Sequence, residues 1–267
     1  MSHACRMLRI SRQAVYQYAG RRHSRCVEES KIIHQVCLTR HIMPRLGTRK
    51  LYARLQSMLS PLGIGRDRLF EMLKSHRLLV RPRKRFTPTT NSGHALPVRP
   101  NLLKLTKPSG PGRVIVADQT YLRLEHGFCY LSLVSDLYSR KIIGVDVSPT
   151  LETAGPLRAL AMAFKSITRH NWFIHHSDRG VQYCSNEYRA FVESRGGQSS
   201  MSAPGCPYDN AVAERINGIL KSEFYLDRVF TSIHHAYEAA EEAVSIYNTE
   251  RPHLSLGMMT PEMRYAA

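Results

Sequence analysis

Residues 114–121 read VIVADQTY, an apolar run that leads directly into Asp118. A short run of this kind is typical of a buried β-strand, so we expect a strand over 114–117 that ends at Asp118. Further strand patterns follow at 121–124 and 128–137, separated by the turn at 126–127, and at 141–147.

The rest of the chain alternates between helical and strand patterns. Helical spacing of apolar residues occurs over 151–168, 186–194, 211–226 and 233–247, and strand-like runs occur at 172–175 and, as an edge strand, 199–202. Three antiparallel strands followed by alternating helices and strands predict one mixed α/β sheet covered by helices.

The first part of the chain contains only helical patterns. We expect helices at 27–39, 49–59 and 66–76, with a further short helix at 10–18. Pro61 and Gly63 break the chain before the last helix, and a helix, a short turn and a basic helix are the pattern of a helix-turn-helix unit. A small bundle that only packs against its neighbour would look the same, so the distribution of charge has to decide.

The positive charge of the chain is concentrated in this first part. Residues 1–112 contain 23 Lys and Arg but four acidic residues, whereas residues 113–267 contain 15 Lys and Arg and 17 acidic residues. Basic residues that meet phosphates release condensed counterions, so such a region suits DNA, whereas a generally basic surface would spread its charge evenly. We expect DNA contacts from Arg66, Arg68, Lys74, Arg83, Lys84 and Arg85.

The segment 81–112 is expected to link two domains. It contains six prolines, three glycines and no acidic residue, which is typical of an extended basic linker that follows a DNA backbone or is a solvated tether. The expected organisation is a helical region at 1–80, this linker, and an α/β domain with C-terminal helices at 113–267.

Composition also excludes several classes of protein. No run approaches the ~18 uninterrupted apolar residues of a membrane span, and the N-terminus lacks the apolar core of a secretory signal. We therefore expect a cytoplasmic protein without a membrane partner. The six cysteines form no C-x-x-C pair, which argues against a zinc ribbon or finger.

Three acidic residues carry the functional hypothesis. Asp118 and Asp178 are expected at the ends of two adjacent central strands, which brings them together, and Glu214 is expected on a helix. Converging carboxylates repel one another unless a cation neutralises them, and hard oxygen ligands favour Mg²⁺ or Mn²⁺. Two such ions can activate an attacking oxygen and stabilise the leaving oxygen in phosphoryl transfer.

Each acidic residue also has an ordinary interpretation. A single Asp after a strand is more often a turn or cap residue, and Glu214 with Lys221 on the same helix face is compatible with a surface ion pair. Asp209 directly precedes a helix, and we interpret it as an N-cap. Asp136 and Asp146 are rival candidates that suit ordinary positions near turns.

In combination, the motifs resemble the DDE transposases of bacterial insertion sequences, specifically the second-reading-frame (OrfB) protein of insertion sequence family three, and retroviral integrase cores. The matching motifs are DQTY at 118–121, HSDRGVQY at 176–183, and PYDNA at 207–211 followed by Glu214. There are 35 residues between Asp178 and Glu214, and Lys221 follows that glutamate by seven positions. The C-terminal signature is matched by Tyr247-Asn248, Arg251-Pro252-His253 and Thr260-Pro261.

The resemblance implies a ribonuclease-H-like fold, preceded by a small all-α helix-turn-helix domain. It implies hydrolysis that frees a 3′-OH at the element ends, then attack of that 3′-OH on a target phosphodiester. Asp118, Asp178 and Glu214 would hold two Mg²⁺ ions, or Mn²⁺ in their place, and Lys221 would position DNA. Supporting or DNA-contacting roles would fall to His176, Tyr208 and Asn210, for each of which local hydrogen bonding or capping is the ordinary alternative.

The expected partners are DNA at the element ends and target, further copies of the chain on that DNA, and the product of an upstream reading frame. Two alternatives stay open. Another nuclease of the same fold, such as a junction resolvase, would lack the Arg251-Pro252-His253 signature. A catalytically silent DNA-binding regulator would be expected to have lost one of the three acidic residues, and all three are present.

Overall fold

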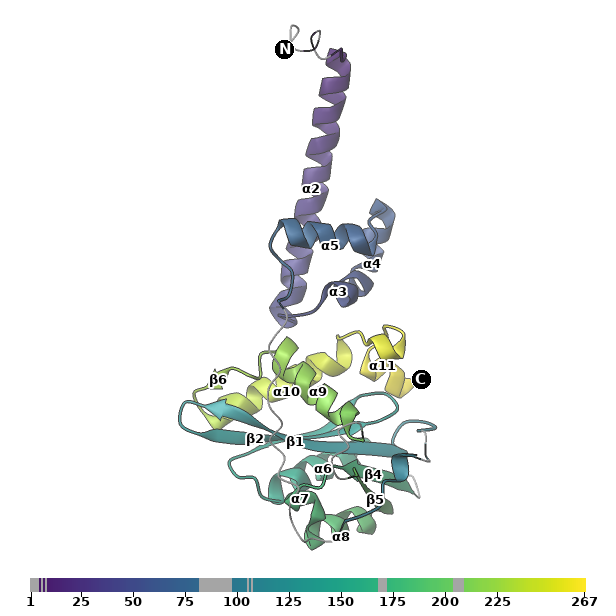
Figure 1. Cartoon of the computed structure of the whole chain (residues 1–267), viewed down its shortest axis with the longest axis vertical. Coiled ribbons are helices and arrows are strands. Elements are labelled where there is room, and N and C mark those ends of the chain that lie inside the picture. The colour runs from purple at the N-terminus through teal and green to yellow at the C-terminus, as the bar shows by residue number, and fades with distance from the viewer. Residues whose placement is uncertain are drawn as a thin grey trace. The chain divides into compact units, whose positions relative to one another are not determined.

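The computed structural model describes residues 5, 7, 9–81, 98–104, 106, 108–167, 172–203 and 209–267. The chain divides into two compact units, Met1–Val80 and Arg81–Ala267 (Figure 1). Each unit is described by itself. None of the helices in the described part of the chain combines the length and the apolar character that crossing a lipid bilayer requires.

The first unit begins with one long helix, α2 (Arg12–Ile42). Ser11 caps it by accepting a hydrogen bond of 3.0 Å from the backbone N–H of Ala14. Separate helices at 10–18 and 27–39 were expected, and this prediction was wrong, because a lone glycine at position 20 weakens a helix without ending it. Only the second half of α2 packs, through Ile32, Val36 and Thr39, whereas almost every residue of the first half is exposed.

Four short helical segments complete the first unit. The helix expected at 49–59 is interrupted at Leu55, and the segment continues into a left-handed turn at Gly63, where φ is 62°. Leucines at positions 51, 59, 69 and 73 are fully buried and form the small core of the unit. The elements are α3 (Thr48–Arg54), α4 (Gln56–Leu59), η1 (Ser60–Leu62) and α5 (Arg66–Ser75).

The second unit is built on a mixed sheet of order β3-β2-β1-β4-β5, with β6 pairing to β1. β1 is antiparallel to β2, and β2 to β3, whereas β4 and β6 run parallel to β1, and β5 parallel to β4. The predicted edge strand is β5. The strands are β1 (Val114–Leu124), β2 (Phe128–Asp136), β3 (Ile142–Ser148), β4 (Phe173–Ser177), β5 (Gly197–Met201) and β6 (Val229–Phe230).

One strand differs from the sequence expectation. The runs at 114–117 and 121–124 form a single strand, so Asp118 lies within β1 and not at its end. The reason is the antiparallel ladder with β2, which continues past Asp118 through its pairing with Leu133 and on to Arg123. Polar residues at 118–120 interrupt the apolar pattern without interrupting the backbone pairing.

Helices cover both faces of this sheet, as predicted (Figure 1). Alternate strand residues point to opposite faces, so Ile115 and Ala117 pack on one side, while Leu122 and Leu131 pack on the other. The first face is covered by α6 (Ala154–Ser166), α7 (Val181–Cys184) and α8 (Asn186–Ser194). The second is covered by α9 (Ala211–Glu223) and α10 (Ile233–Thr249), followed by η3 (Leu254–Leu256) and α11 (Pro261–Ala266).

The described residues 98–104 of the segment 81–112 include contacts with the sheet. The backbone N–H of Leu102, in η2 (Leu102–Lys104), donates to Ser200 Oγ at 2.9 Å, and the N–H of Met201 donates to the carbonyl of Pro100. Pro100 and Leu102 therefore lie beside β5.

Candidate active site

The two aspartates occupy equivalent positions on neighbouring strands. The last paired residues of the parallel strands β1 and β4 are Val116 and His176. Asp118 and Asp178 each follow two positions after these paired residues. Asp118 still lies within β1, whereas Asp178 directly follows the end of β4 at Ser177. Because adjacent strands lie about 4.8 Å apart, this register brings the two carboxylates to the same place.

The environment of Asp118 favours its neutral form. Burial is the largest cause, followed by the negative charge of Asp178, and together they raise the pKa of Asp118 to about 7. Two hydrogen bonds oppose that rise, from the side chain of Asn217 at 2.8 Å and from the backbone of Gln119. The charge of Glu214 raises the pKa slightly further.

The loop after β4 holds Asp178. The backbone N–H of Gly180 donates to Asp178 Oδ1 at 2.9 Å. Arg179 Nε donates to the carbonyl of Ser202 at 2.7 Å, which fixes the same loop to the residue that follows β5. Asp178 is thus held by its own turn and by the neighbouring strand.

Glu214 projects from the first turn of α9 and is exposed. Burial of its carboxylate and then the charge of Asp178 raise its pKa. Because the charge of Asp178 acts on both Asp118 and Glu214, the three acidic residues predicted from the sequence share one electrostatic environment. A side chain at Gly218, one turn further along α9, would meet only open space.

Lys221 lies on the same helix face and reaches strand β1. Its Nζ donates to Thr120 Oγ1 at 2.6 Å and lies 4.3 Å from the centre of the Tyr121 ring. Burial lowers the pKa of Lys221 to about 8, the charge of Asp118 opposes that effect, and Arg123 adds to it. The ammonium group is therefore held two residues from Asp118.

The chemistry of this group fits divalent cations. It supplies carboxylate oxygens, the ligands that Mg²⁺ and Mn²⁺ prefer, and the raised pKa values of Asp118 and Glu214 reflect a surplus of negative charge that a cation would neutralise. In the described part of the chain, however, no three His, Cys, Asp or Glu side chains converge closely enough to hold one ion among them. The three carboxylates influence one another through their charges but do not form such a cluster in the described residues.

The supporting residues predicted from sequence have different surroundings. His176 is fully buried and bonds through Nδ1 to Ser200 Oγ at 2.8 Å, so it joins β4 to β5. Burial lowers its pKa to about 4, against the influence of Asp209. Asn210 is buried, and neither polar atom of its side chain has a partner among the described residues. Tyr208 lies outside the residues that the structure describes.

Two residues near the carboxylates were missed by the sequence analysis. Asn217, which donates to Asp118, lies three residues after Glu214; this spacing places it near Glu214 on α9 but does not distinguish it from the other polar residues of that helix. The hydroxyl of Tyr183 is buried without a hydrogen-bond partner in the described structure. Burial, the neighbouring Tyr188 and the charges of both aspartates raise the pKa of Tyr183 well above its usual value.

The rival acidic residues have local partners. Asp136 is fully buried and accepts hydrogen bonds from the backbone of Gly112 at 2.8 Å and from Ser139, while Asp146 forms a bidentate pair with Arg158 at 2.8 and 2.9 Å.

The interpretation of Asp209 as an N-cap was wrong. Asn210 occupies the N-cap position of α9, without a capping hydrogen bond from its side chain. Asp209 Oδ2 instead accepts from the backbone of Ala203 at 2.8 Å, which ties the start of α9 to the end of β5.

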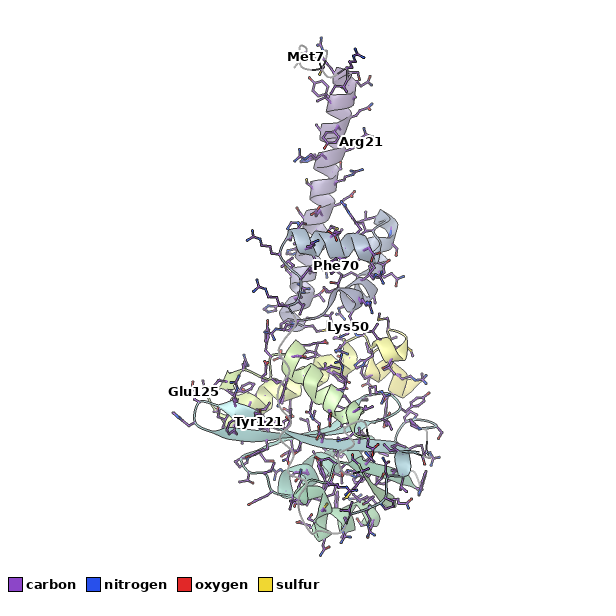
Figure 2. The ribbon with its side chains drawn as sticks, viewed as in Figure 1. Met7, Arg21, Lys50, Phe70, Tyr121 and Glu125 are labelled. Carbon is purple, nitrogen blue, oxygen red and sulfur yellow. The ribbon has the colours of Figure 1, made fainter. Side chains whose placement is uncertain are left out.

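The DNA-binding residues expected in the first unit lie on α5. Arg66 pairs with Asp67 at 2.8 Å and Lys74 with Glu71 at 3.8 Å, both on the exposed surface, and Arg68 is exposed as well. Arg21 lies on the free half of α2, which also carries Arg12, Arg22 and Arg25 (Figure 2). The expected contacts at Arg83, Lys84 and Arg85 fall outside the described residues.

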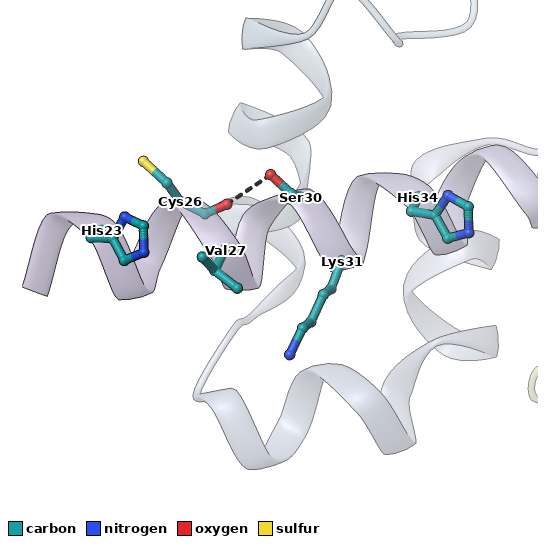
Figure 3. Close-up of a pocket in the computed structure, with 6 residues that line it drawn as sticks. All are labelled: His23, Cys26, Val27, Ser30, Lys31 and His34. Carbon is teal, nitrogen blue, oxygen red and sulfur yellow. Dashed lines mark hydrogen bonds between the residues drawn. The ribbon is translucent and has the colours of Figure 1, made fainter.

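A surface hollow lies along one face of α2 (Figure 3). Ser30 Oγ in this hollow donates to the carbonyl of Cys26 in its own helix. Because one helix supplies the whole lining, the hollow does not enclose a ligand. The lining residues are His23, Cys26, Val27, Ser30, Lys31 and His34.

The second unit matches a known protein family. Residues 108–207 and 195–261 each match a family described as the integrase core domain. Together these matches include Asp118, Asp178 and Glu214.

Similar proteins extend over nearly the whole chain. An insertion element IS600 uncharacterized 31 kDa protein of Shigella sonnei is 36% identical over 263 residues, which are 96% of this chain and 95% of that protein. The transposase InsF for insertion sequence IS3A of Escherichia coli (strain K12) is 33% identical over 267 residues, 97% of this chain and 91% of that protein.

A solved structure shares the fold. A chain of the simian T-cell lymphotropic virus intasome, solved in complex with PP2A regulatory subunit B56 gamma, matches 83% of this chain and 75% of its own length. The TM-score is 0.52 at 17% sequence identity. The second unit has the ribonuclease-H-like fold expected from the sequence, and a helical region precedes it.

Proposed function

Because the chain belongs to the IS3-type transposases of bacterial insertion sequences and carries their integrase core, we propose that Asp118, Asp178 and Glu214 are its catalytic carboxylates. The chain is a transposase, a polynucleotidyl transferase. The observation that supports the site is the effect of the Asp178 charge on both Asp118 and Glu214. The three residues lie far apart in the sequence: in β1, directly after β4 and in α9. Among the causes of the raised pKa of Asp136, by contrast, no other acidic residue appears; its carboxylate accepts hydrogen bonds from Gly112 and Ser139.

We infer that these carboxylates hold two Mg²⁺ ions, or Mn²⁺ in their place. When bound, the two ions would activate the attacking oxygen and stabilise the leaving oxygen of a phosphodiester. Asn217 orients Asp118 by donating to Oδ2. Lys221 is held beside Thr120 and would supply the positive charge that contacts a DNA phosphate. The proposed reactions are cleavage that frees a 3′-OH and transfer of that 3′-OH to target DNA.

The first unit is proposed to bind DNA through a helix-turn-helix arrangement of α3 to α5. Phosphates would be contacted by Arg66, Arg68 and Lys74. Two of these residues form exposed ion pairs within α5, Arg66 with Asp67 and Lys74 with Glu71, and such pairs are weak enough for DNA to displace. Arg83, Lys84 and Arg85 would extend these contacts. The proposed organisation is a DNA-binding region at 1–80, a basic linker at 81–112, and a catalytic core at 113–267.

The proposed setting is the bacterial cytoplasm, with several copies of the chain assembled on element ends and target DNA. The product of an upstream reading frame is a further proposed partner. Size measurements on element-end DNA, with and without that product, would test both proposals. A single copy on DNA that joins ends at full rate would contradict the proposed assembly.

Strand transfer of pre-cut element ends in Mg²⁺ tests the catalytic site. We expect Glu214→Gln to bind DNA like the wild type and to join no ends. Equal activity of the two proteins would refute the site. DNA binding by the wild type with no cleavage or joining in either metal would instead indicate a silent regulator.

A further inference from the structure

The C-terminal signature that the sequence analysis singled out is buried, and it surrounds an arginine. Arg251 is only 2% exposed and is among the largest fully buried side chains in the described structure. A buried guanidinium is tolerated only when a carboxylate and further hydrogen bonds compensate its charge. The partners of Arg251 therefore show what the signature does.

Those partners join the signature to the helix that carries Glu214. Arg251 Nε donates to Glu223 Oε2 at 2.9 Å, and Nη2 donates to Oε1 at 2.8 Å, so the pair is bidentate. Nη1 donates to His253 Nε2 at 2.8 Å. Glu223 is the last residue of α9, so the arginine binds that helix at the end opposite to Glu214.

The other end of the signature is fixed to the sheet. Asn248 accepts a hydrogen bond from the backbone N–H of Ile142 at 2.9 Å and donates one to the Ile142 carbonyl at 2.8 Å. The hydroxyl of Tyr247 donates to the carbonyl of Arg140 at 3.1 Å. The end of α10 is thus anchored beside the start of β3, and Arg251 extends from that anchor to α9.

We propose that Arg251 is a positioning residue that acts through Glu223 to fix α9 along its axis, and so places the carboxylate of Glu214 opposite Asp118 and Asp178. Asn217 and Lys221 join the middle of α9 to β1. The two-pronged pair between the planar guanidinium of Arg251 and the carboxylate of Glu223 sets both distance and orientation at the far end of the helix. Glu214 lies nine residues from Glu223, about 14 Å along the helix, so an axial shift of α9 moves Glu214 by the same amount.

This proposal rests on the proposed catalytic site, and metal binding tests it without an activity assay. Free Mn²⁺ is measured by electron paramagnetic resonance during titration of the full-length chain, and thermal unfolding is recorded for every variant. Groups that hydrogen-bond a metal ligand directly typically contribute 10- to 100-fold in affinity. Arg251 acts at one remove, through Glu223 and α9, so we expect Arg251→Met to weaken Mn²⁺ binding by the lower end of that range, about tenfold. Arg158→Met is the control for loss of a bidentate pair as such, since it removes a pair with Asp146 that joins α6 to β3; the Arg158 side chain is 55% exposed, so the stability of each variant is compared as well.

The double variant Glu223→Gln/Arg251→Met separates positioning from stability. It removes both charges of the buried pair, so it should recover part of the melting temperature lost in Arg251→Met, yet its Mn²⁺ binding should stay weak. If its Mn²⁺ affinity recovers with the melting temperature, or if Arg158→Met weakens Mn²⁺ binding equally, Arg251 is only a stabilising residue. It also serves as the second variant if Arg251→Met does not fold.

Glu214→Gln distinguishes this inference from the proposed function. If that variant binds Mn²⁺ like the wild type, the proposed site has failed. If it binds Mn²⁺ weakly while Arg251→Met binds like the wild type, only the positioning role has failed.

Discussion

The side-chain amide of Asn217 donates a hydrogen bond of 2.8 Å to Asp118 Oδ2, which joins helix α9 to strand β1 within the proposed catalytic site. Asn217 is itself buried. Asn217 and Asp118 are 99 positions apart in the sequence, so this contact links two parts of the site that no local pattern connects.

Replacement of Asn217 should therefore affect catalysis more than folding. Asn217→Leu keeps the size of the side chain but removes the donor, and we expect about 1 kcal/mol of lost stability. Strand transfer should fall about tenfold or more, because Asp118 loses its orientation. Urea unfolding and single-turnover joining measure the two effects. Ser245→Ala, at an exposed position of α10, is the control and should change neither quantity. If the joining rate of Asn217→Leu falls only as far as its loss of stability explains, the expectation is contradicted.

Asp118 should make the stability of the metal-free protein depend on pH. Its folded pKa of about 7 lies above the value of 3.8 for a free side chain, so the folded state holds its proton more tightly. This contribution is complete below about pH 4 and is lost as the pH rises through 7.

Asp118→Asn tests that dependence. At pH 8 the variant should be more stable than the metal-free wild type, by on the order of 1–2 kcal/mol, and the difference should vanish at pH 4. Excess Mg²⁺ should stabilise the wild type but not the variant. Denaturant unfolding at both pH values measures the difference, and a variant that is less stable at pH 8 would refute the burial of charge at Asp118.

Lys221 should set the alkaline limit of DNA joining. Burial lowers its pKa to about 8, so the proposed phosphate-contacting charge is present below that pH and is lost above it. We expect wild-type activity to decline above pH 8, whereas Lys221→Arg, which stays protonated, should keep a flatter profile. Lys165→Arg, at an exposed position on α6, is the control. Identical alkaline profiles for wild type and Lys221→Arg would exclude this role.

The basic residues of α5 should contribute to DNA affinity through counterion release. Arg68→Ala should weaken duplex binding at all sequences and reduce the slope of log affinity against log salt by about 1. Fluorescence anisotropy from 50 to 200 mM salt, about the range over which such slopes are measured, provides the test. The joining rate at saturating DNA should be unchanged, and an unaltered salt slope would remove Arg68 from the interface.

The sequence predicted the main elements of the second unit because their patterns are local. Asn186–Ser194 and the start of α9 at Ala211 were predicted to the residue. Asp118 was placed at a strand end because polar residues follow it, and only the pairing with β2 shows that the strand continues. For the same reason, the acceptor role of Asp209 toward Ala203 had no signal in the sequence.

Residues that act across the fold were harder to predict. The three acidic residues were proposed from their spacing and surrounding motifs, whereas Asn217 is one of many polar residues on an amphipathic helix. Arg251 was identified only as part of a signature, because an arginine is ordinarily exposed. Its burial depends on Glu223, which lies 28 positions away, and such a pairing is visible only in three dimensions.

Helix α2 combines two environments within one continuous element. Its second half is packed, and its first half is surrounded by solvent. An isolated helix as short as this first half is marginally stable in water. The amide hydrogens of the first half should therefore exchange with solvent deuterium almost as fast as those of a free peptide. Those around Ile32 and Val36 should exchange only when the unit opens. Any partner that binds the exposed first half would then appear as slower exchange there, residue by residue.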